Sequence, residues 1–263
     1  MADKKIIISV RDLVKSFGDR RVLDGVSLDI YQGETFIIMG GSGCGKSTLL
    51  RHMIGAIHPD SGKVFFDNKD ITALTEDDKE KIKRRFGMCF QSAALLDYMN
   101  VEENVSLPLK EHTALDPNII GVIVRMKLNL VGLQGFENLM PSMLSGGMKK
   151  RVGLARAIAM DPEVVFYDEP TAGLDPIVCA VVDKLILDLN KKLLLTSIVV
   201  THNMESIFRI ADRVAMLHKG RVLQVGTPQE IKNSTNPIVQ QFIRGEIEGP
   251  INFLGGEDIG PGE

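Results

Sequence analysis

The glycine-rich segment Gly40–Ser47 constrains this chain more than any other feature. It satisfies the pattern GxxxxGK[ST], follows the apolar run 36–39 and precedes apolar residues at helical spacing over 49–57. Glycines let the backbone curl so that its N–H groups point at phosphate oxygens, and the N-terminus of the following helix adds positive potential. The sequence therefore predicts a strand, a phosphate-binding loop and a helix in succession, as in an α/β nucleotide-binding core.

The side chains of this loop indicate what it contacts on a bound nucleotide. Lys46 is expected to reach the β and γ phosphates, and Ser47 is expected to ligate Mg²⁺. Cys44 is a thiol among phosphate-binding N–H groups at a helix N-terminus, where the thiolate is favoured, so we expect a reactive cysteine that ATP shields. The predicted nucleotide-contacting residues of the loop are Gly40, Gly41, Ser42, Gly43, Cys44, Gly45, Lys46, Ser47 and Thr48.

Two adjacent carboxylates follow a second apolar run, 164–167. Open α/β sheets bind ligands at the carboxyl ends of their strands, so Asp168 is placed to hold Mg²⁺ through its shell. Glu169, one residue further, points elsewhere and can accept a proton from an attacking water. A hydrolase needs such a base and a passive nucleotide binder does not, so the pair indicates ATP hydrolysis.

Length and composition limit the remaining possibilities. With 263 residues, 44% of them hydrophobic, the chain can bury a substantial core and suits one domain with a sub-lobe. The formal net charge of −3 excludes a global basic field of the kind that attracts nucleic acid. No apolar stretch approaches the roughly 20 residues that cross a bilayer, and no signal peptide is visible. The three cysteines are scattered, which fits a reducing cytosol.

The order of expected elements indicates an α/β fold. Strands are expected over 6–10, 22–30, 34–39 and 63–66, the last opening a hairpin at Asp67-Asn68. From 92 to 160 the pattern becomes helical, with breaks expected at Pro108, Pro117, Gly132 and Pro141. Strands at 164–167 and 197–200, separated by the amphipathic run 178–195, form a βαβ rhythm and should pair in parallel. Capping patterns at Thr227 and Asn236 predict two short helices near the end.

The segment Leu144–Met148 reads Leu-Ser-Gly-Gly-Met and resembles the signature of ABC transporter ATPases. In that family a second glycine-rich helix start clamps the γ-phosphate held by a partner subunit, so two chains sandwich two ATPs. The resemblance assigns this clamp to Ser145, Gly146 and Gly147. The usual signature ends in glutamine; Met148 cannot hydrogen-bond as an amide does and is expected to pack instead.

Four further positions match this family one by one. Phe17 resembles the aromatic residue that stacks on adenine, although packing in a β-lobe would also explain it. Gln91 resembles the glutamine that touches Mg²⁺ and water and links the ATP site to the helical lobe. Asp175 resembles the loop that crosses the dimer interface, and His202 resembles the switch histidine that contacts the γ-phosphate and orients Glu169.

The resemblance implies a P-loop NTPase (RecA-like) core with an antiparallel β-lobe and an inserted helical ABC sub-lobe. We expect residues 1–91 to form the β-lobe and the first part of the ATP-binding core, and 92–160 the helical sub-lobe. The second part of the core is expected over 161–230, and a C-terminal helix with an extended tail over 231–263. Ile251, Phe253 and Leu254 form an apolar anchor, so we expect the tail from Glu246 to dock on a neighbouring subunit; a disordered end is the alternative.

A narrower resemblance concerns the transport system. Met148, the segments 91–96 and 100–105, Leu107-Pro108-Leu109 and the tail segment 249–253 together look like the ATPase of Mla-type, MCE-associated lipid transporters. That family implies two copies of this subunit, a pair of integral-membrane permeases and an MCE-type substrate-binding protein. It also implies a peripheral place on the cytoplasmic face of the bacterial inner membrane, phospholipid as cargo, and no nucleic acid.

Three other functions stay open at this stage. An ATPase of an importer for a polar solute, such as an amino acid or metal complex, would share every catalytic residue. A soluble ABC ATPase in DNA repair or translation would generally carry paired modules, coiled coils or basic surfaces, and none is visible. An adenylate-kinase-like phosphotransferase would use Lys46 but leave Ser145, Gln91 and His202 without a purpose.

Overall fold

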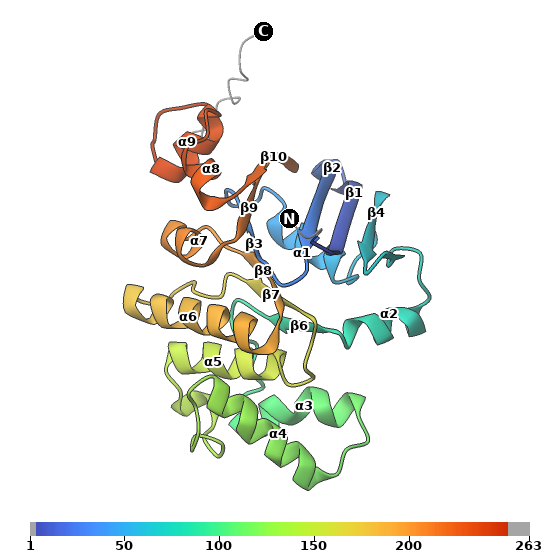
Figure 1. Ribbon diagram of the computed structural model, residues 1–263, viewed down its shortest axis with the longest axis vertical. Helices are drawn as coiled ribbons and strands as arrows, with labels where there is room; N and C mark the ends of the chain where they lie inside the picture. Colours follow the sequence, from blue (N-terminus) through green and yellow to red (C-terminus); the bar gives the residue numbers. More distant parts are fainter. Residues whose placement is uncertain (1–3, 252–263) are drawn as a thin grey trace.

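The computed structural model describes residues 4–251 and contains two sheets (Figure 1). The smaller sheet is antiparallel, with strand order β2-β1-β4-β5. Its strands are β1 (Ile6–Phe17), β2 (Arg20–Tyr31), β4 (Ser61–Phe66) and β5 (Lys69–Asp70). The expected hairpin at Asp67-Asn68 is confirmed, because both residues take positive φ between β4 and β5.

The larger sheet forms the centre of the molecule and has the order β10-β9-β3-β8-β7-β6. The pairs β3–β8, β3–β9, β7–β8 and β6–β7 are parallel, and only β10 runs antiparallel to its neighbour. The expected parallel pairing of 164–167 with 197–200 is therefore confirmed. The strands are β3 (Thr35–Met39), β6 (Phe86–Cys89), β7 (Val164–Asp168), β8 (Thr196–Val200), β9 (Arg213–His218) and β10 (Arg221–Gly226).

Helices and the smaller sheet cover both faces of the central sheet. The helices are α1 (Lys46–Met53), α2 (Glu76–Lys83), α3 (Val101–His112), α4 (Pro117–Leu130), α5 (Gly146–Ala157), α6 (Pro176–Leu193), α7 (Met204–Ile210), α8 (Pro228–Lys232) and α9 (Pro237–Arg244). Figure 1 shows α3, α4 and α5 stacked together at the end of the molecule away from the smaller sheet. The middle of the chain is thus a helical lobe, as its sequence pattern predicts.

Strand β3 shows how the core is divided. All five of its residues are buried, which is typical of a parallel strand covered on both faces. Ile37 and Met39 pack with the apolar residues of α5, α6 and the helical lobe. Phe36 and Ile38 point to the other face, towards α1 and the smaller sheet. The period-two alternation of a strand therefore joins the three parts of the fold into one core.

Most helices begin at a residue whose side chain accepts a hydrogen bond from the first-turn backbone. Capping boxes start α3 at Asn100 and α8 at Thr227, and Asn236 caps α9, as expected for the last two. The expected break at Pro108 is wrong, because α3 continues through it to His112. The capping box at one end and the buried residues Val101, Val105 and Leu109 hold the helix despite the missing N–H.

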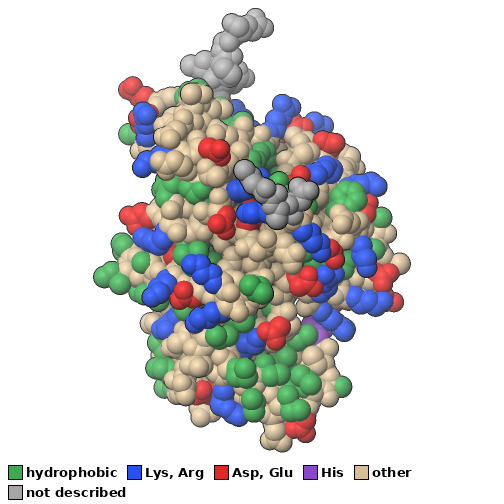
Figure 2. Space-filling view, in the orientation of Figure 1, with side chains coloured by type: hydrophobic (Ala, Val, Ile, Leu, Met, Phe, Trp, Pro, Cys, Tyr) green, Lys and Arg blue, Asp and Glu red, His purple; other side chains and the backbone are tan. Residues whose placement is uncertain are grey.

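The surface carries charges of both signs. In Figure 2 lysines, arginines, aspartates and glutamates are interspersed over most of this face, whereas hydrophobic side chains gather over the helical lobe. Large exposed apolar residues on or next to α4 are Leu115, Ile119, Val122 and Met126. A helical lobe with such a face has apolar surface left for contact with another protein.

Candidate functional site

The glycine-rich loop lies between β3 and α1, where sequence reasoning places it. Two of its glycines cannot be replaced without movement of the backbone around them. A Cβ at Gly40, whose φ is +151°, would lie 2.1 Å from the carbonyl oxygen of Leu217. A Cβ at Gly45, whose φ is +107°, would lie 2.7 Å from the carbonyl oxygen of Val22. The loop is therefore pressed between β2 and the β9–β10 turn, which fixes its curvature.

The N-terminus of α1 suits an anionic ligand. Its N-cap residue is Gly45, no side chain caps it, and its first turn has no acidic residue. Lys46 is 91% buried, and its Nζ donates to the carbonyl oxygens of Gly40 (2.8 Å) and Gly41 (2.9 Å). Uncapped N–H groups, the helix dipole and a lysine folded over the same loop fit a phosphate group.

The predicted metal ligands Ser47, on α1, and Asp168, at the end of β7, lie side by side. Ser47 Oγ donates to Asp168 Oδ1 at 3.3 Å, so residues 121 positions apart meet beside the phosphate-binding loop. Burial raises the pKa of the Asp168 carboxyl above its usual value, against the hydrogen bond from Ser47. A hydroxyl and a half-buried carboxylate are hard oxygen ligands, and a bound divalent cation would favour the ionised form of Asp168. The donor set fits Mg²⁺.

Glu169 is held in a strained backbone conformation next to this pair. Its φ is +48°, unusual for a residue with a side chain, and its N–H donates to the carbonyl oxygen of Val200 at 2.9 Å. Thr201 Oγ1 donates to Glu169 Oε2 at 3.2 Å, and Nδ1 of His202 lies 2.8 Å from Oε1. The structure thus brings Glu169 and His202 together, and it adds Thr201, which sequence reasoning missed.

The signature residues Ser145, Gly146 and Gly147 stand at the start of α5. Ser145 is the N-cap and accepts a hydrogen bond from the N–H of Met148 at 3.3 Å. Ser145 and Gly146 are exposed. Asp175 caps α6 in the same way, accepting from the N–H groups of Ile177 and Val178 at 3.0 Å. The start of α5 therefore presents small residues at the surface, whereas at the start of α6 the Asp175 carboxylate occupies the first-turn N–H groups.

Gln91 and Phe17 both have exposed side chains. Strand β6 pairs in parallel with β7, so Gln91, just after β6, lies at the same end of the sheet as Asp168 and Glu169. Phe17 ends β1, is 53% exposed, and has the Nζ of Lys15 at 5.6 Å from its ring centroid. An exposed aromatic ring at a strand end is free to stack on a planar ligand.

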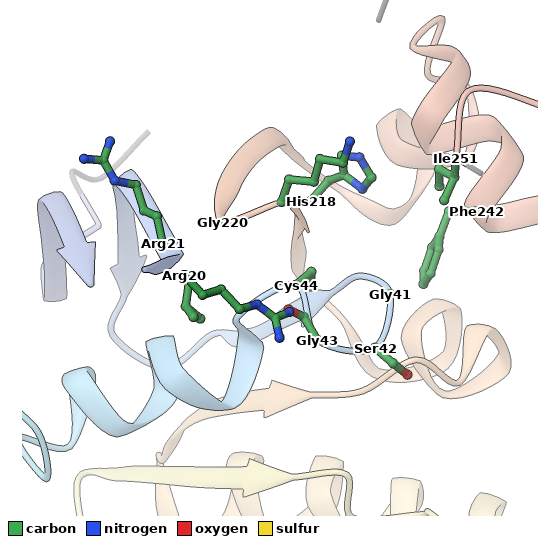
Figure 3. A pocket seen from close by; sticks show the side chains of 12 residues that line it. Arg20, Arg21, Gly41, Ser42, Gly43, Cys44, His218, Gly220, Phe242 and Ile251 are labelled. Carbon is green, nitrogen blue, oxygen red and sulfur yellow. The ribbon is translucent and has the colours of Figure 1, made fainter. Parts of the chain in front are cut away.

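A cavity of about 310 Å³ lies against the phosphate-binding loop (Figure 3). Sequence reasoning missed Arg20 in its wall: the guanidinium reaches the loop and donates to the carbonyl oxygen of Gly43 at 3.2 Å. No motif marks Arg20, because its contact depends on the β1–β2 hairpin folding over the loop. The lining residues are Arg20, Arg21, Val22, Gly41, Ser42, Gly43, Cys44, His218, Lys219, Gly220, Phe242 and Ile251.

The expectation of a favoured thiolate at Cys44 is wrong. Cys44 is buried, and that burial raises the pKa of the thiol more than the neighbouring Lys46 ammonium lowers it. The Cys44 side chain turns into the core cluster shared with Leu49 and Leu217. Within the expected tail anchor, Ile251 is buried against its own chain, where its backbone bonds Gln241, so docking on a neighbouring subunit stays a prediction. Phe253 and Leu254 lie outside the described residues.

Comparison with known proteins decides the family. The family model described as "ABC transporter" matches residues 23–172, which include the phosphate-binding loop, Gln91, the signature segment and the carboxylates. The chain belongs to the ABC transporter family. The expected fold class and ATPase activity are thereby confirmed, since solved ABC ATPase cassettes superpose on most of this chain.

Two solved ABC structures show this structural similarity. CbiO1 from Clostridium perfringens, part of the ABC transporter complex cbiONQ, has a TM-score of 0.82 and 32% sequence identity, covering 93% of this chain and 95% of its own. A dimeric ATP-binding cassette in a post-hydrolysis state, bound to ADP and Pi, has a TM-score of 0.77 and 31% identity, covering 84% of this chain and 99% of its own.

Curated ABC relatives match nearly the whole chain. The intermembrane phospholipid transport system ATP-binding protein MlaF of Haemophilus influenzae is 43% identical over 247 residues, 94% of each chain. The protein TRIGALACTOSYLDIACYLGLYCEROL 3 of Arabidopsis thaliana is 43% identical and covers 95% of this chain and 77% of its own. The probable ribonucleotide transport protein mkl of Mycobacterium leprae is 40% identical over 94% of this chain and 72% of its own.

None of the helices described over residues 4–251 is long and apolar enough to cross a membrane.

Proposed function

We propose that this chain is the ATP-hydrolysing subunit of a phospholipid transporter, and that two copies close around two ATPs to drive a membrane permease. ATP hydrolysis is supported by four residues that meet where the strands of the central sheet end: Ser47, Asp168, Glu169 and His202. The similarity to MlaF over 94% of the chain supports the phospholipid part. The proposed place is the cytoplasmic face of a bacterial inner membrane, beside permeases and an MCE-type substrate-binding protein.

The residues divide the work as follows. The N–H groups of the loop and Lys46 bind the β and γ phosphates, and Phe17 stacks on adenine. Ser47, Asp168 and Gln91 hold Mg²⁺, which neutralises developing charge on the phosphates when bound. Glu169, oriented by Thr201 and His202, accepts the proton of the attacking water.

The site is completed by a second chain. Ser145 starts helix α5 at the surface, and its exposed N-terminal end suits a γ-phosphate bound to a partner, whereas Asp175 is expected in the loop that crosses the dimer interface. Dimeric ATP-binding cassettes among the similar structures support this arrangement. We therefore expect Ser145, Gly146 and Gly147 of one chain to clamp the ATP held by the loop of the other.

Glu169→Gln tests the hydrolytic role. It keeps size and hydrogen bonding but removes the base, so ATP turnover should fall by roughly 10² to 10⁴. ATP and Mg²⁺ should then hold two chains together, which light scattering after size exclusion detects. Glu163→Gln is the matched control, because Glu163 lies before the opposite end of β7 and pairs with Arg85. Hydrolysis by Glu169→Gln at the unmodified rate would refute the assignment.

Mixed dimers test the arrangement in trans. In a Glu169→Gln background, a Lys46→Ala chain is combined with a Ser145→Arg chain. One composite site is then damaged twice and the other contains only intact binding motifs, so one ATP per dimer should be retained on filtration. If each chain built its own complete site, no dimer would retain ATP.

The cargo is tested with the permeases that co-purify with the chain. In reconstituted vesicles, ATP hydrolysis should be stimulated by phospholipid and should move labelled phospholipid. A second candidate, transport of a polar solute, is favoured by the relative named for probable ribonucleotide transport. Stimulation by nucleotides or other polar solutes, and none by phospholipid, would select that alternative.

A further inference from the structure

Lys150 is a buried cation in the middle of the functional loops. It lies on α5, is 7% exposed, and makes no ion pair with a carboxylate of residues 4–251. Its Nζ donates instead to two backbone carbonyls, those of Gln91 and Glu169, the latter at 3.3 Å. Burying an ammonium group away from water is costly unless its hydrogen bonds are made, so these two carbonyls are what hold it there.

A second cation of α5 holds the segment that follows Gln91. Arg156 donates to the carbonyl oxygens of Ala93 (2.6 Å) and Ala94 (2.8 Å). Both alanines have positive φ, +61° and +47°, so this segment is strained without such contacts. Gly153, between the two cations, allows close approach: a Cβ there would lie 3.2 Å from Cβ of Ala93.

Glu169 is also strained, and both of its backbone hydrogen-bonding groups are occupied. Its N–H is bound to Val200 in β8, and its carbonyl oxygen accepts from Lys150 in α5 and from the N–H of Ala172 at 3.2 Å. One ammonium group therefore connects three functional parts: the helix that begins with the signature, the segment of Gln91, and the proposed base.

We propose that Lys150 is a positioning residue for ATP hydrolysis, which ties the signature helix to the Gln91 segment and to Glu169 so that the three move as one unit. The inference rests on the proposed roles of Gln91 and Glu169. It assigns Lys150 no contact with nucleotide. When α5 moves on meeting a partner's ATP, Lys150 carries that movement to the residues that complete hydrolysis.

Lys150→Met tests the inference, because methionine keeps the apolar stem and removes the donor. ATP affinity, measured with a fluorescent nucleotide, should stay within twofold since the phosphate-binding loop is untouched. The kcat should fall by roughly 10- to 100-fold from misplacement of the catalytic groups. The matched control is Lys127→Met: Lys127 is 5% exposed, lies on α4 and pairs with Asp161, remote from both loops, so its kcat per folded molecule should be unchanged.

A double-mutant cycle separates positioning from simple destabilisation. If Lys150 acts largely through Gln91, Lys150→Met should reduce kcat by a factor at least threefold smaller in a Gln91→Ala background than in the wild type. Equal losses in both backgrounds, or a Lys150→Met enzyme as fast as Lys127→Met, would overturn the inference. Glu169→Gln tests the site itself, so failure of Lys150→Met alone leaves the proposed function standing.

Discussion

The buried carboxylate of Asp183 provides a sensitive test of how α6 and α7 are joined. Asp183 is 0% exposed, and its Oδ2 accepts hydrogen bonds from Arg209 Nη1 (2.6 Å) and Ser206 Oγ (2.9 Å). Helix α6 is capped by Asp175, which is expected at the dimer interface, and α7 follows the loop of His202, so this contact links the helices behind two proposed functional loops. The perturbation is Arg209→Met, which keeps much of the side-chain volume and removes the charge.

The expected loss follows from the geometry. Removing one partner of a buried ion pair costs about 3–5 kcal/mol, because the remaining charge is left uncompensated. Ser206 still donates to Asp183, and Arg209 is 36% exposed in the wild type, so the pair is only partly removed from water. We therefore expect the free energy of unfolding to fall by about 2–3 kcal/mol at pH 7.5.

The pH dependence has a definite sign. Burial raises the pKa of Asp183 above its usual value, against the bonds from Ser206 and Arg209, and loss of Arg209 raises it further. The native state then binds the proton more tightly than the unfolded chain, so acidification favours the native state. The difference in free energy of unfolding between the wild type and Arg209→Met should therefore become smaller from pH 7.5 to 5.5, by at most about 1.4 kcal/mol per pH unit.

Urea denaturation at both pH values measures these quantities, with the slope m expected to be unchanged. Arg244→Met is the matched control, since Arg244 pairs with Glu246 at the surface and its loss should change stability by less than about 0.5 kcal/mol. Asp183→Leu in the Arg209→Met background should recover most of the loss. Equal deficits at both pH values would show that Asp183 is not held as a charged partner.

Three further predictions concern the phosphate-binding region and the signature. The pKa of His52 is lowered chiefly by burial, so its contribution to native stability is complete above about pH 6.5 and declines below it by at most about 1.4 kcal/mol per pH unit. On acidification the wild type should therefore lose stability relative to His52→Leu, which urea titration at each pH measures. A Cβ at Gly147 would lie 2.6 Å from Cγ1 of Val178, so Gly147→Ala should lower the free energy of unfolding by about 1–3 kcal/mol. Adding Val178→Ala should restore this loss, because it removes the clashing methyl group. Gly146→Ala is the control, since a Cβ there would lie 3.5 Å from its nearest neighbour and would not clash. Alkylation of Cys44, followed by mass spectrometry, should be slow with and without ATP; rapid labelling of the nucleotide-free protein would contradict its burial and raised pKa.

The sequence by itself determined the parts of this protein that depend on neighbouring residues. The loop Gly40–Ser47 with its flanking strand and helix, the carboxylates Asp168 and Glu169 at a strand end, and the helix start at Ser145 are local patterns. Loop curvature, strand periodicity and N-capping are set within a few residues. For that reason the fold class and the ATPase activity could be predicted before any coordinates.

Two helices were not predicted correctly. Helix α2, Glu76–Lys83, was missed because it is largely charged and has no apolar stripe of the kind that marks a buried helix face, although Thr75 caps it and its first turn is acidic. Pro108 indicates a break, yet α3 runs through it because the packing of its buried face outweighs one missing hydrogen bond. At Pro108 the tertiary contacts are therefore stronger than the local propensity.

Only the tertiary structure decided which side chains meet across long stretches of sequence. Cys44 occupies a loop position where a thiolate would be favoured, but its side chain turns into the core, and desolvation there outweighs the nearby positive charge. Lys150 looks like a surface lysine in a charged run, yet folding brings it to the carbonyls of Gln91 and Glu169, residues 59 and 19 positions away. A sequence pattern reports the chemistry that each residue offers, whereas burial and partners, which set pKa values and hydrogen bonds, arise only when distant segments pack together.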